Sequence, residues 1–384
     1  MNYDYSIITK SLYIHWPFCP YKCHFCPFVA IAGQDKFMQQ YHDALKKEII
    51  SYSKSVSQKQ ALDTIFIGGG TPSTWPDDML LDMSDTLKDV FILNEKTEIS
   101  IEVNPGTVRI EQLAVWEQAG INRLSIGVQS LKDSVLSNLN RKQSNADVFW
   151  LLNHASKMFD NISVDLILGL PEVSEQEWKD LLAQAISWPI KHISVYFLTV
   201  HEETPLYFRV KKNELSLQTD DHMIDLYQWT VAYLADHGFE QYEISNFAKD
   251  GKRSRHNSIY WERKPYKGFG LGACSFDGSS RFQNQKNLMK YMHAISSDQD
   301  HVQFRETLTP AQVHLEKVML GLRKSEGIAI ETIIDHLNDE QKKLMLGTLA
   351  YLQENKFLQQ RNDRIILTPA GLGVQNDIAA RLSW

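Results

Sequence analysis

The sequence predicts an α/β protein with a partial (β/α)6 TIM-like barrel, followed by a C-terminal, mainly helical, winged-helix-like domain. Short β-branched or apolar runs alternate with longer segments of helical periodicity over roughly the first half of the 384 residues. From about Thr309 the pattern is helical, and a hairpin-like run, LQQRNDRIILT, follows. A β-α-β order implies parallel strands with right-handed crossovers, which close fully or partly into a barrel.

Six apolar runs are predicted to be buried parallel strands, because each is short and most are rich in β-branched residues. They are SLYIHW (11–16), TIFIGG (64–69), EISIEV (98–103), RLSIGVQ (123–129), ISVDLILG (162–169) and HISVYFLTV (192–200). The segments between them show helical periodicity, for example residues 37–54 and 79–91. Six units in place of eight would leave the barrel open on one side.

The rest of the chain is predicted to extend the barrel and then form a separate domain. A helical pattern at residues 220–238 precedes an aromatic- and glycine-rich stretch up to about residue 278, which we expect to form strands and loops. The predicted segments are a barrel over 1–205, a barrel extension over 206–304 and the winged-helix-like domain over 305–384. The last segment has ten Lys or Arg against ten Asp or Glu, which favours a structural role over DNA binding.

Composition narrows the partners and the compartment. The chain is 43% hydrophobic and 23% charged, as in ordinary folded proteins, and its net charge of −7 argues against nucleic acid or an anionic membrane as the main partner. The N-terminal residues do not resemble a signal peptide, and no run of about 18 apolar residues predicts a membrane span. We therefore expect a cytoplasmic protein whose thiols stay reduced.

Three of the four cysteines, Cys19, Cys23 and Cys26, lie close together in WPFCPYKCHFCPF (16–28). Two residues separate the first of them from the end of the first predicted strand. An odd number of thiols in a reducing compartment argues against disulfides. A zinc site completed by His24 or by the remote Cys274 is one alternative. Three thiolates also suit a [4Fe–4S] cluster whose fourth iron is left for another ligand. Because the run follows a strand of the barrel, it lies where barrel ligands bind.

Polar residues at the ends of other predicted strands face the same mouth. GGGTPS (68–73) follows the second strand, and its glycines let the backbone approach a ligand, although a plain tight turn is the alternative. Glu102, Gln129 and Asp165 interrupt apolar strands and need partners, which a ligand or a structural hydrogen bond would supply. Arg141 can pair with a carboxylate through its planar fork, or can be solvated on a helix.

The C-x-x-x-C-x-x-C spacing after the first strand resembles the radical S-adenosylmethionine (SAM) superfamily. That resemblance implies a [4Fe–4S] cluster on the three clustered cysteines, with the amino and carboxylate groups of SAM on the open iron. The SAM and cofactor-binding residues that it implies are Tyr13, Phe25, Gly69, Gly70, Thr71, Glu102, Gln129, Arg141 and Asp165.

Six strings resemble the oxygen-independent coproporphyrinogen III oxidase family over nearly the whole chain. They are LYIHWPFCPYKCHFC, IEVNPGT, RLSIGVQS, VDLILGLP, YEISNFA and RHNSIYW. The family contains decarboxylating oxidases and HemW-type heme chaperones, and three features resemble the chaperones. Phe28 stands where the oxidases carry a further cysteine, the chain begins only ten residues before the first strand, and HNSIYW (256–261) matches the HNxxYW signature of the chaperones.

The resemblance implies a protein that binds heme through His256 as an axial ligand and delivers it to apoproteins, with an electron donor as a further partner. The alternative for the signature is structural, with His256 capping a turn and Tyr260 and Trp261 in the core. The alternative functions are SAM-dependent oxidative decarboxylation of coproporphyrinogen III, and radical SAM chemistry on another tetrapyrrole. These residues leave open whether the chain is an enzyme.

Several positions depart from the pattern of the chaperone subgroup, and they put the substrate in question more than the fold. They are Pro27 for an aspartate, Gln143 for a histidine, Glu172 and Val173 for Gly-Gln, His201 for a glutamate and Cys274 for a histidine. Cys274 is expected to be a small buried side chain; the alternatives are a heme thiolate, a radical-relay thiol or a fourth cluster ligand.

Overall fold

The structure is a computed structural model that describes residues 9–56 and 58–383. The chain forms two compact units, each built from two separate segments. The first, which we call the barrel unit, comprises the described residues up to Leu217 together with Pro265–Glu306. The second unit comprises Gln218–Lys264 and the residues from Thr307 onward. The two units alternate along the chain. The three consecutive segments expected from the sequence stay a prediction.

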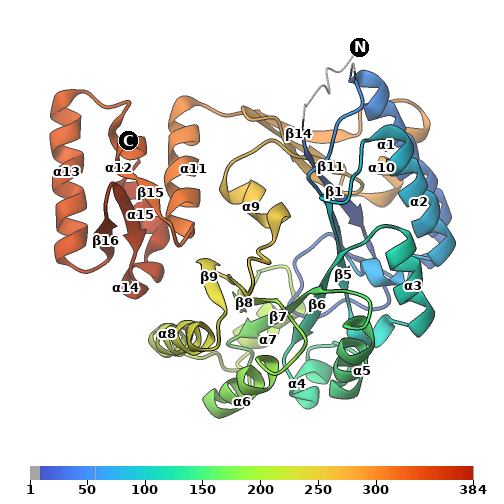
Figure 1. Cartoon of the computed structure of the whole chain (residues 1–384), viewed down its shortest axis with the longest axis horizontal. Helices are drawn as coiled ribbons and strands as arrows, with labels where there is room; N and C mark the ends of the chain where they lie inside the picture. The colour runs from blue at the N-terminus through green and yellow to red at the C-terminus, as the bar shows by residue number, and fades with distance from the viewer. Residues whose placement is uncertain (1–8, 57, 384) are drawn as a thin grey trace. The chain divides into compact units, whose positions relative to one another are not determined.

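Parallel strands in sequence order form the centre of the barrel unit, as the apolar runs predict (Figure 1). These strands are β1 (Ser11–Trp16), β4 (Thr64–Gly69), β5 (Glu98–Val103), β6 (Arg123–Gln129), β7 (Asn161–Leu168) and β8 (His192–Phe197). Each pairs in parallel with the next, for example Ile14 with Ile67 and Ile67 with Ile101. The predicted fold class is confirmed, and the six predicted strands differ from the observed ones only at their ends.

The segment after Pro265 completes the free edge of β1. The strand β11 (Lys267–Phe269) pairs in parallel with β1, so the row of strands runs β11-β1-β4-β5-β6-β7-β8. A smaller sheet and a helix follow: β12 (Cys274–Phe276), β13 (Ser280–Asn284), α10 (Leu288–Ser296) and β14 (Val302–Thr307). This part of the glycine-rich stretch adds the strand β11 to the sheet of the barrel unit.

Helices connect the strands and bury one apolar face each against them (Figure 1). The main ones are α1 (Met38–Ser55), α2 (Asp77–Val90), α3 (Ile110–Gln118), α5 (Asn145–Ala155) and α6 (Glu175–Ala185). Both α5 and α6 begin at a capping box, in which a serine accepts from a backbone N–H and an acidic residue returns the bond: Ser144 with Asp147, and Ser174 with Glu177. Such boxes explain why these helices begin where the sequence changes from turn residues to apolar periodicity.

Short elements lie between the main ones, and the sequence did not predict them. Two short strands, β2 (Phe18–Cys19) and β3 (Ile31–Ala32), pair with each other. The remaining helical turns of this unit are η1 (Asp35–Phe37), η2 (Pro72–Thr74), η3 (Pro105–Thr107), α4 (Asp133–Asn138) and α7 (Pro205–Lys211).

A buried carboxylate joins α1 to the segment that follows Pro265. Glu48 accepts hydrogen bonds from the backbone N–H of Gly270 at 2.9 Å, from Asn284 at 2.8 Å and from the Tyr291 hydroxyl at 2.6 Å. The Nε2 atom of His301 lies 3.0 Å from its Oε1. Burial alone would raise the pKa of Glu48, but His301 and Lys267 outweigh it and lower the pKa to about 2.

The second unit is mainly helical, with a small antiparallel sheet in the order β15-β17-β16 (Figure 1). Its first segment forms α8 (Asp220–Asp236), β9 (Glu240–Glu243), β10 (Asn246–Ala248) and α9 (Arg255–Trp261). Its second forms α11 (Pro310–Arg323), β15 (Ile328–Ala329), α12 (Ile330–Ile334), α13 (Asp339–Glu354), β16 (Leu358–Arg361), β17 (Arg364–Leu367), α14 (Pro369–Leu372) and α15 (Gln375–Arg381). Helices α11, α12 and α13 with the hairpin β16–β17 match the winged-helix-like expectation. Helix α9 corrects the expectation that the aromatic- and glycine-rich stretch forms only strands and loops.

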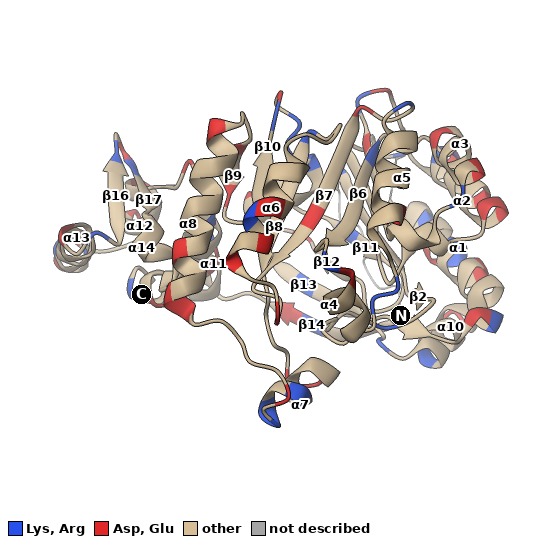
Figure 2. Cartoon of the chain, turned by 90° about the horizontal axis from the view of Figure 1, so that it is seen from below, with Lys and Arg blue, Asp and Glu red and all other residues tan. Residues whose placement is uncertain are grey.

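Charged residues of both signs are interspersed over the described helices and strands (Figure 2). This distribution agrees with the small negative net charge of −7. None of the helices among residues 9–56 and 58–383 is long and apolar enough to cross a membrane.

Candidate functional site

A pocket of about 410 Å3 lies at the carboxyl ends of the barrel strands. Most of the residues predicted from the sequence line it: Cys19, Cys23, Phe25, Cys26, Gly69, Gly70, Thr71, Glu102, Gln129, Arg141 and Asp165. Tyr13 does not line it; its hydroxyl bonds His15 Nδ1 at 2.9 Å, and its ring stacks on Phe66 within the barrel. The structure thus brings the predicted cluster and SAM residues together, while their roles stay predictions.

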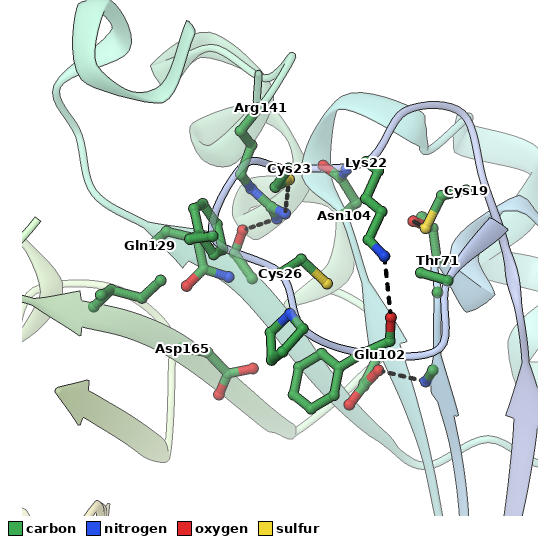
Figure 3. Close-up of a pocket in the computed structure, with 18 of the residues that line it drawn as sticks. Cys19, Lys22, Cys23, Cys26, Thr71, Glu102, Asn104, Gln129, Arg141 and Asp165 are labelled. Carbon is green, nitrogen blue, oxygen red and sulfur yellow. Dashed lines mark hydrogen bonds between the residues drawn. The ribbon is translucent and has the colours of Figure 1, made fainter. Parts of the chain in front are cut away.

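The three cysteines lie on one loop, which begins at β2 and ends at β3 (Figure 3). Backbone hydrogen bonds tie the loop to the barrel: Ile31 N donates to Pro17 O at 2.7 Å, and Thr71 N donates to Phe18 O at 2.9 Å. Beneath it, the rings of Trp16 and Trp75 stack with their centroids 4.4 Å apart. A loop held at several points positions its thiols before any ligand binds.

Each buried thiol of this loop has a polar neighbour. Thr71 Oγ1 donates to Cys19 Sγ at 3.1 Å, and Arg141 Nη1 lies 3.8 Å from Cys23 Sγ (Figure 3). Burial raises the pKa of Cys19 to about 11 and also raises that of Cys26. These two thiols are therefore protonated at neutral pH, and a metal must displace the protons to bind there.

The donor set fits a [4Fe–4S] cluster better than a single zinc ion. Among the described residues, no group of three or more His, Cys, Asp or Glu side chains converges as a mononuclear site requires. A cubane cluster binds each thiolate through a different iron, so its ligands need not converge on one point. The two fourth ligands considered for zinc, His24 and Cys274, do not line this pocket. Cys274 is exposed on β12, which corrects the expectation of a buried side chain.

Two half-buried carboxylates, Glu102 on β5 and Asp165 on β7, face the pocket. Glu102 Oε2 accepts a hydrogen bond from the Gly69 backbone N–H at 3.0 Å, and Asp165 Oδ2 accepts one from Ser125 Oγ at 2.9 Å. Asp165 Oδ1 is buried without a hydrogen-bond partner among the described residues. Burial raises the pKa of Glu102 to about 7, and the negative charge of Asp165 adds to the rise. Such a pair fits a ligand that brings hydroxyl or ammonium donors.

Arg141 is held with its guanidinium at the pocket. Its Nη2 donates to the Gly127 carbonyl at 2.5 Å, and its Nε donates to Gln143 Oε1 at 2.8 Å. A Cβ on residue 127 would lie only 2.8 Å from that Nη2, so a larger residue there would displace the arginine side chain from this position. Arg141 lies in the irregular segment after α4, which corrects the alternative of an exposed helical arginine.

Sequence reasoning missed Asn104 and Tyr21 as parts of the site, and it named Gln143 only as a departure from the family pattern, without a role. Gln143 donates to the Val128 carbonyl at 2.7 Å while accepting from Arg141. Asn104 donates to the Tyr21 hydroxyl at 2.7 Å, and its own carbonyl oxygen is buried without a partner among the described residues. Asn104 directly follows a strand in IEVNPGT, so its position was a signal that would have identified it.

Exposed side chains surround the mouth of the pocket. We define the aromatic rim as Phe28, Tyr196, Phe197 and His201, which all line the pocket and are all exposed. Phe28 lies on the cysteine loop, and the other three lie at or after the end of β8. The pocket therefore has polar residues in its interior and aromatic residues at its opening.

Comparison with known proteins agrees with this geometry. The profile of the radical SAM superfamily matches residues 13–185, and that of the HemN C-terminal domain matches residues 308–374. Heme chaperone HemW from Bacillus subtilis is 33% identical over 371 residues, covering 96% of this chain and 98% of that protein. HemW from Synechocystis is 33% identical over 368 residues, with coverages of 94% and 88%. The chain belongs to the HemW family of radical SAM proteins.

The same family relation is visible in three dimensions. The solved structure of coproporphyrinogen III oxidase (HemN) from Escherichia coli matches with a TM-score of 0.83 at 26% identity, covering 97% of this chain and 89% of that one. Membership of the radical SAM superfamily implies a [4Fe–4S] cluster and SAM, and the pocket residues described above fit both.

In this HemW-family chain the HNSIYW signature forms helix α9 of the second unit. His256 is 1% exposed, and its Nε2 forms a hydrogen bond with the Tyr260 hydroxyl at 2.8 Å. The guanidinium of Arg323 stacks 4.3 Å from the centre of the Trp261 ring and also pairs with Glu243. These contacts thus engage three of the four fixed side chains of the signature, His256, Tyr260 and Trp261. The assignment of His256 as a heme ligand stays a prediction.

Proposed function

We propose that this chain binds heme and delivers it to apoproteins, and that it holds a [4Fe–4S] cluster and SAM in the barrel pocket. The observation that carries the proposal is its similarity, over nearly the full length of both chains, to proteins named heme chaperone HemW. Phe28, which is exposed at the pocket, also supports it. In the pattern of the oxidases of the wider family, a further cysteine is expected at that position. We place the protein in the cytoplasm, with an electron donor as a further partner.

In this proposal Cys19, Cys23 and Cys26 would hold the cluster, and the other pocket residues described above would bind SAM. When bound, the cluster supplies an electron to SAM. The chain's own residues bind and orient SAM: the glycines 69 and 70 allow close backbone approach, and Arg141 offers its fork to the carboxylate. The buried oxygen of Asp165 that has no partner among the described residues would accept a bond from a ligand hydroxyl.

Glu102 and Gln129 complete the proposed SAM site. Glu102 is oriented by the Gly69 N–H, which leaves its second oxygen for an ammonium or hydroxyl donor. Gln129 has a positive φ of 67°, an unusual value for a residue with a side chain, at the end of β6. Such a conformation is retained at a cost, which supports a role for the residue in the site.

The heme-binding part of the proposal involves the HNSIYW signature. An imidazole is a good axial ligand for heme iron, and aromatic side chains cover porphyrin faces well. For His256 to bind iron through Nε2, its hydrogen bond to the Tyr260 hydroxyl has to break. Heme binding at His256 would therefore be coupled to a rearrangement of α9.

A second candidate function is oxidative decarboxylation of coproporphyrinogen III. The structural match to HemN favours this function: the TM-score is 0.83 at 26% identity, and the match covers 97% of this chain. Phe28 in place of a further cysteine argues against it. The departures at Gln143 and His201 leave a third possibility in the same class, a radical SAM enzyme that acts on another tetrapyrrole.

One experiment separates these functions. The anaerobically reconstituted protein is titrated with hemin, and the loaded protein is mixed with an apo-hemoprotein whose own Soret band reports transfer. In parallel, reduced protein is incubated with SAM and coproporphyrinogen III, and carbon dioxide is measured. We expect one heme per chain, transfer to the acceptor and no carbon dioxide. Absence of stoichiometric heme, or turnover of coproporphyrinogen at enzymatic rates, would refute the proposal.

A further inference from the structure

We propose that heme binds on the aromatic rim of the barrel pocket, between Phe28 and the Tyr196–Phe197 pair, with His201 as its axial ligand. This inference rests on the proposed function, since it assumes that the chain carries heme. It differs from the expectation based on the HNSIYW signature, which assigns the ligand to His256.

The aromatic side chains of the rim are exposed where they line the pocket. Phe28 is 66% exposed, Tyr196 40% and Phe197 37%, although all three line the pocket at the barrel mouth. A side chain that lines a pocket and is exposed lies at its opening. Large aromatic side chains gathered at the opening of a pocket are costly in water and mark a binding surface.

The aromatic residues of the rim come from two separate parts of the barrel unit. Phe28 lies on the loop between β2 and β3, which follows β1, whereas Tyr196 and Phe197 end β8. The strands β4 to β7 lie between β1 and β8 in the sheet. The two aromatic groups thus come from separate ends of the row of parallel strands and line one opening. A flat apolar ring that spans such an opening contacts both groups, and the macrocycle of heme is flat, apolar and wide.

His201 and His256 differ in how available their imidazoles are to heme iron. His201 is exposed, and its ring makes no hydrogen bond or ion pair with the described residues. Its backbone is nevertheless fixed, because its carbonyl accepts from Thr204 Oγ1 at 2.6 Å and from Thr204 N at 3.0 Å. His256 is 1% exposed and already bonded to Tyr260. Iron that arrives from solvent therefore meets an available ligand at residue 201 and an occupied one at residue 256.

The volume of the pocket and the charge of Lys22 are also compatible with heme on the rim. A pocket of about 410 Å3 is near the lower end of the range for small-molecule sites, roughly 300–1,000 Å3, so it holds one ligand of the size of SAM. Heme on the rim would lie above that ligand, and need not compete with it. Lys22 is exposed, lines the same pocket, and offers an ammonium group to a heme propionate.

The test is a hemin titration of the cluster-loaded protein, followed by difference absorption and by magnetic circular dichroism for the axial ligand. His201→Ala should lose the imidazole signature and weaken hemin affinity at least tenfold. Phe28→Ala should weaken affinity severalfold while keeping the signature. His237→Ala removes an exposed histidine of the second unit and is the matched control, expected to bind like the parent. Metal-free protoporphyrin IX should respond to Phe28→Ala but not to His201→Ala.

The outcomes distinguish this inference from the proposed function. If His201→Ala keeps the parent's affinity and imidazole signature, the rim site is refuted, whether or not His256→Ala loses them. In that case the proposed function still stands, because the parent binds heme. If the parent takes up no stoichiometric heme, the proposed function itself fails, and this inference fails with it.

Discussion

Gln143 holds Arg141 in place, because its Oε1 accepts a hydrogen bond from Arg141 Nε at 2.8 Å while its Nε2 donates to the Val128 carbonyl at 2.7 Å. In the chaperone pattern that the sequence resembles, a histidine is expected at that position. The amide has a donor and an acceptor on one planar group, as a neutral imidazole does, and so can take the same place. The departure therefore keeps the arginine fixed and removes a titratable group.

We predict that Gln143→Ala weakens SAM binding to the cluster-loaded protein by roughly threefold to tenfold, the cost of one hydrogen bond that orients a charged group. Isothermal titration measures the effect. Gln143→His should restore the affinity, which loss of general stability would not allow. Equal affinities of Gln143→Ala and the parent would show that Arg141 does not depend on this contact.

We predict that Cys19, Cys23 and Cys26 each bind the cluster and that Cys274 does not. The first three share a loop at the pocket, whereas Cys274 is exposed on β12 and accepts a weak contact from Gln283 at 3.4 Å. Anaerobic reconstitution of each cysteine-to-alanine variant, with iron and sulfide counted, is the measurement. Cys274→Ala serves as the control with parent stoichiometry; four-iron loss in that variant would contradict the assignment.

We predict that Glu102→Ala and Asp165→Ala each weaken SAM binding by roughly tenfold to a hundredfold, as expected for a hydrogen bond to a charged group. Both carboxylates line the pocket, and Asp165 Oδ1 has no other partner among the described residues. Glu95→Ala removes an exposed carboxylate and is the control. If both pocket variants bind SAM as tightly as the parent, the SAM site lies elsewhere.

We predict a pH-dependent difference in stability between the cluster-free parent and Glu102→Gln. Burial raises the pKa of Glu102 from 4.5 to about 7, so the folded protein keeps a proton that the unfolded chain loses. The resulting stabilisation is complete below pH 4.5 and is lost as the pH rises through 7. The difference amounts to about 3 kcal/mol. Urea unfolding at several pH values should show the parent losing stability relative to the variant; parallel profiles would exclude the effect.

We predict that Gly70→Ala lowers both the melting temperature and the retention of the cluster. A Cβ at residue 70 would lie 2.5 Å from the Pro17 carbonyl oxygen and 2.8 Å from that of Phe18, at the start of the cysteine loop. Backbone has to move to relieve that overlap. Gly347→Ala in α13 meets nothing within 4 Å and should stabilise the protein by about 0.5–1 kcal/mol. Normal cluster retention in Gly70→Ala would show that the loop adjusts freely.

The elements that could be predicted from the sequence are those with local causes. Apolar runs such as TIFIGG and RLSIGVQ are buried on both faces of a parallel sheet, so their composition alone identifies them. The pocket could be predicted in the same way, because the cysteine spacing and the polar strand ends are also local patterns. Helix α9 was missed because its seven residues are too few to show periodicity, although Ser254 is an ordinary N-cap.

The contacts that could not be predicted join residues far apart in the chain. The pairing of β1 with β11 links residues about 250 positions apart, and no local pattern encodes it. The hydrogen bond of Arg141 to Gly127 depends on the irregular path of the chain after α4. The burial of His256 depends on how α9 packs, so the motif alone suggested an available imidazole where the structure has an occupied one.

The partners of Glu48 set a condition on how the protein can be made. This carboxylate is synthesised early, in α1, yet Gly270, Asn284, Tyr291 and His301 all follow it by more than 220 residues. Until that later segment has left the ribosome, the barrel cannot bury Glu48 without leaving its charge uncompensated. The nascent barrel must therefore wait with this edge hydrated, and the chain that interrupts it, Gln218–Lys264, is translated during that wait. A ribosome that stalls before His301 would leave an exposed, unfinished barrel, which is a form that chaperones and proteases recognise.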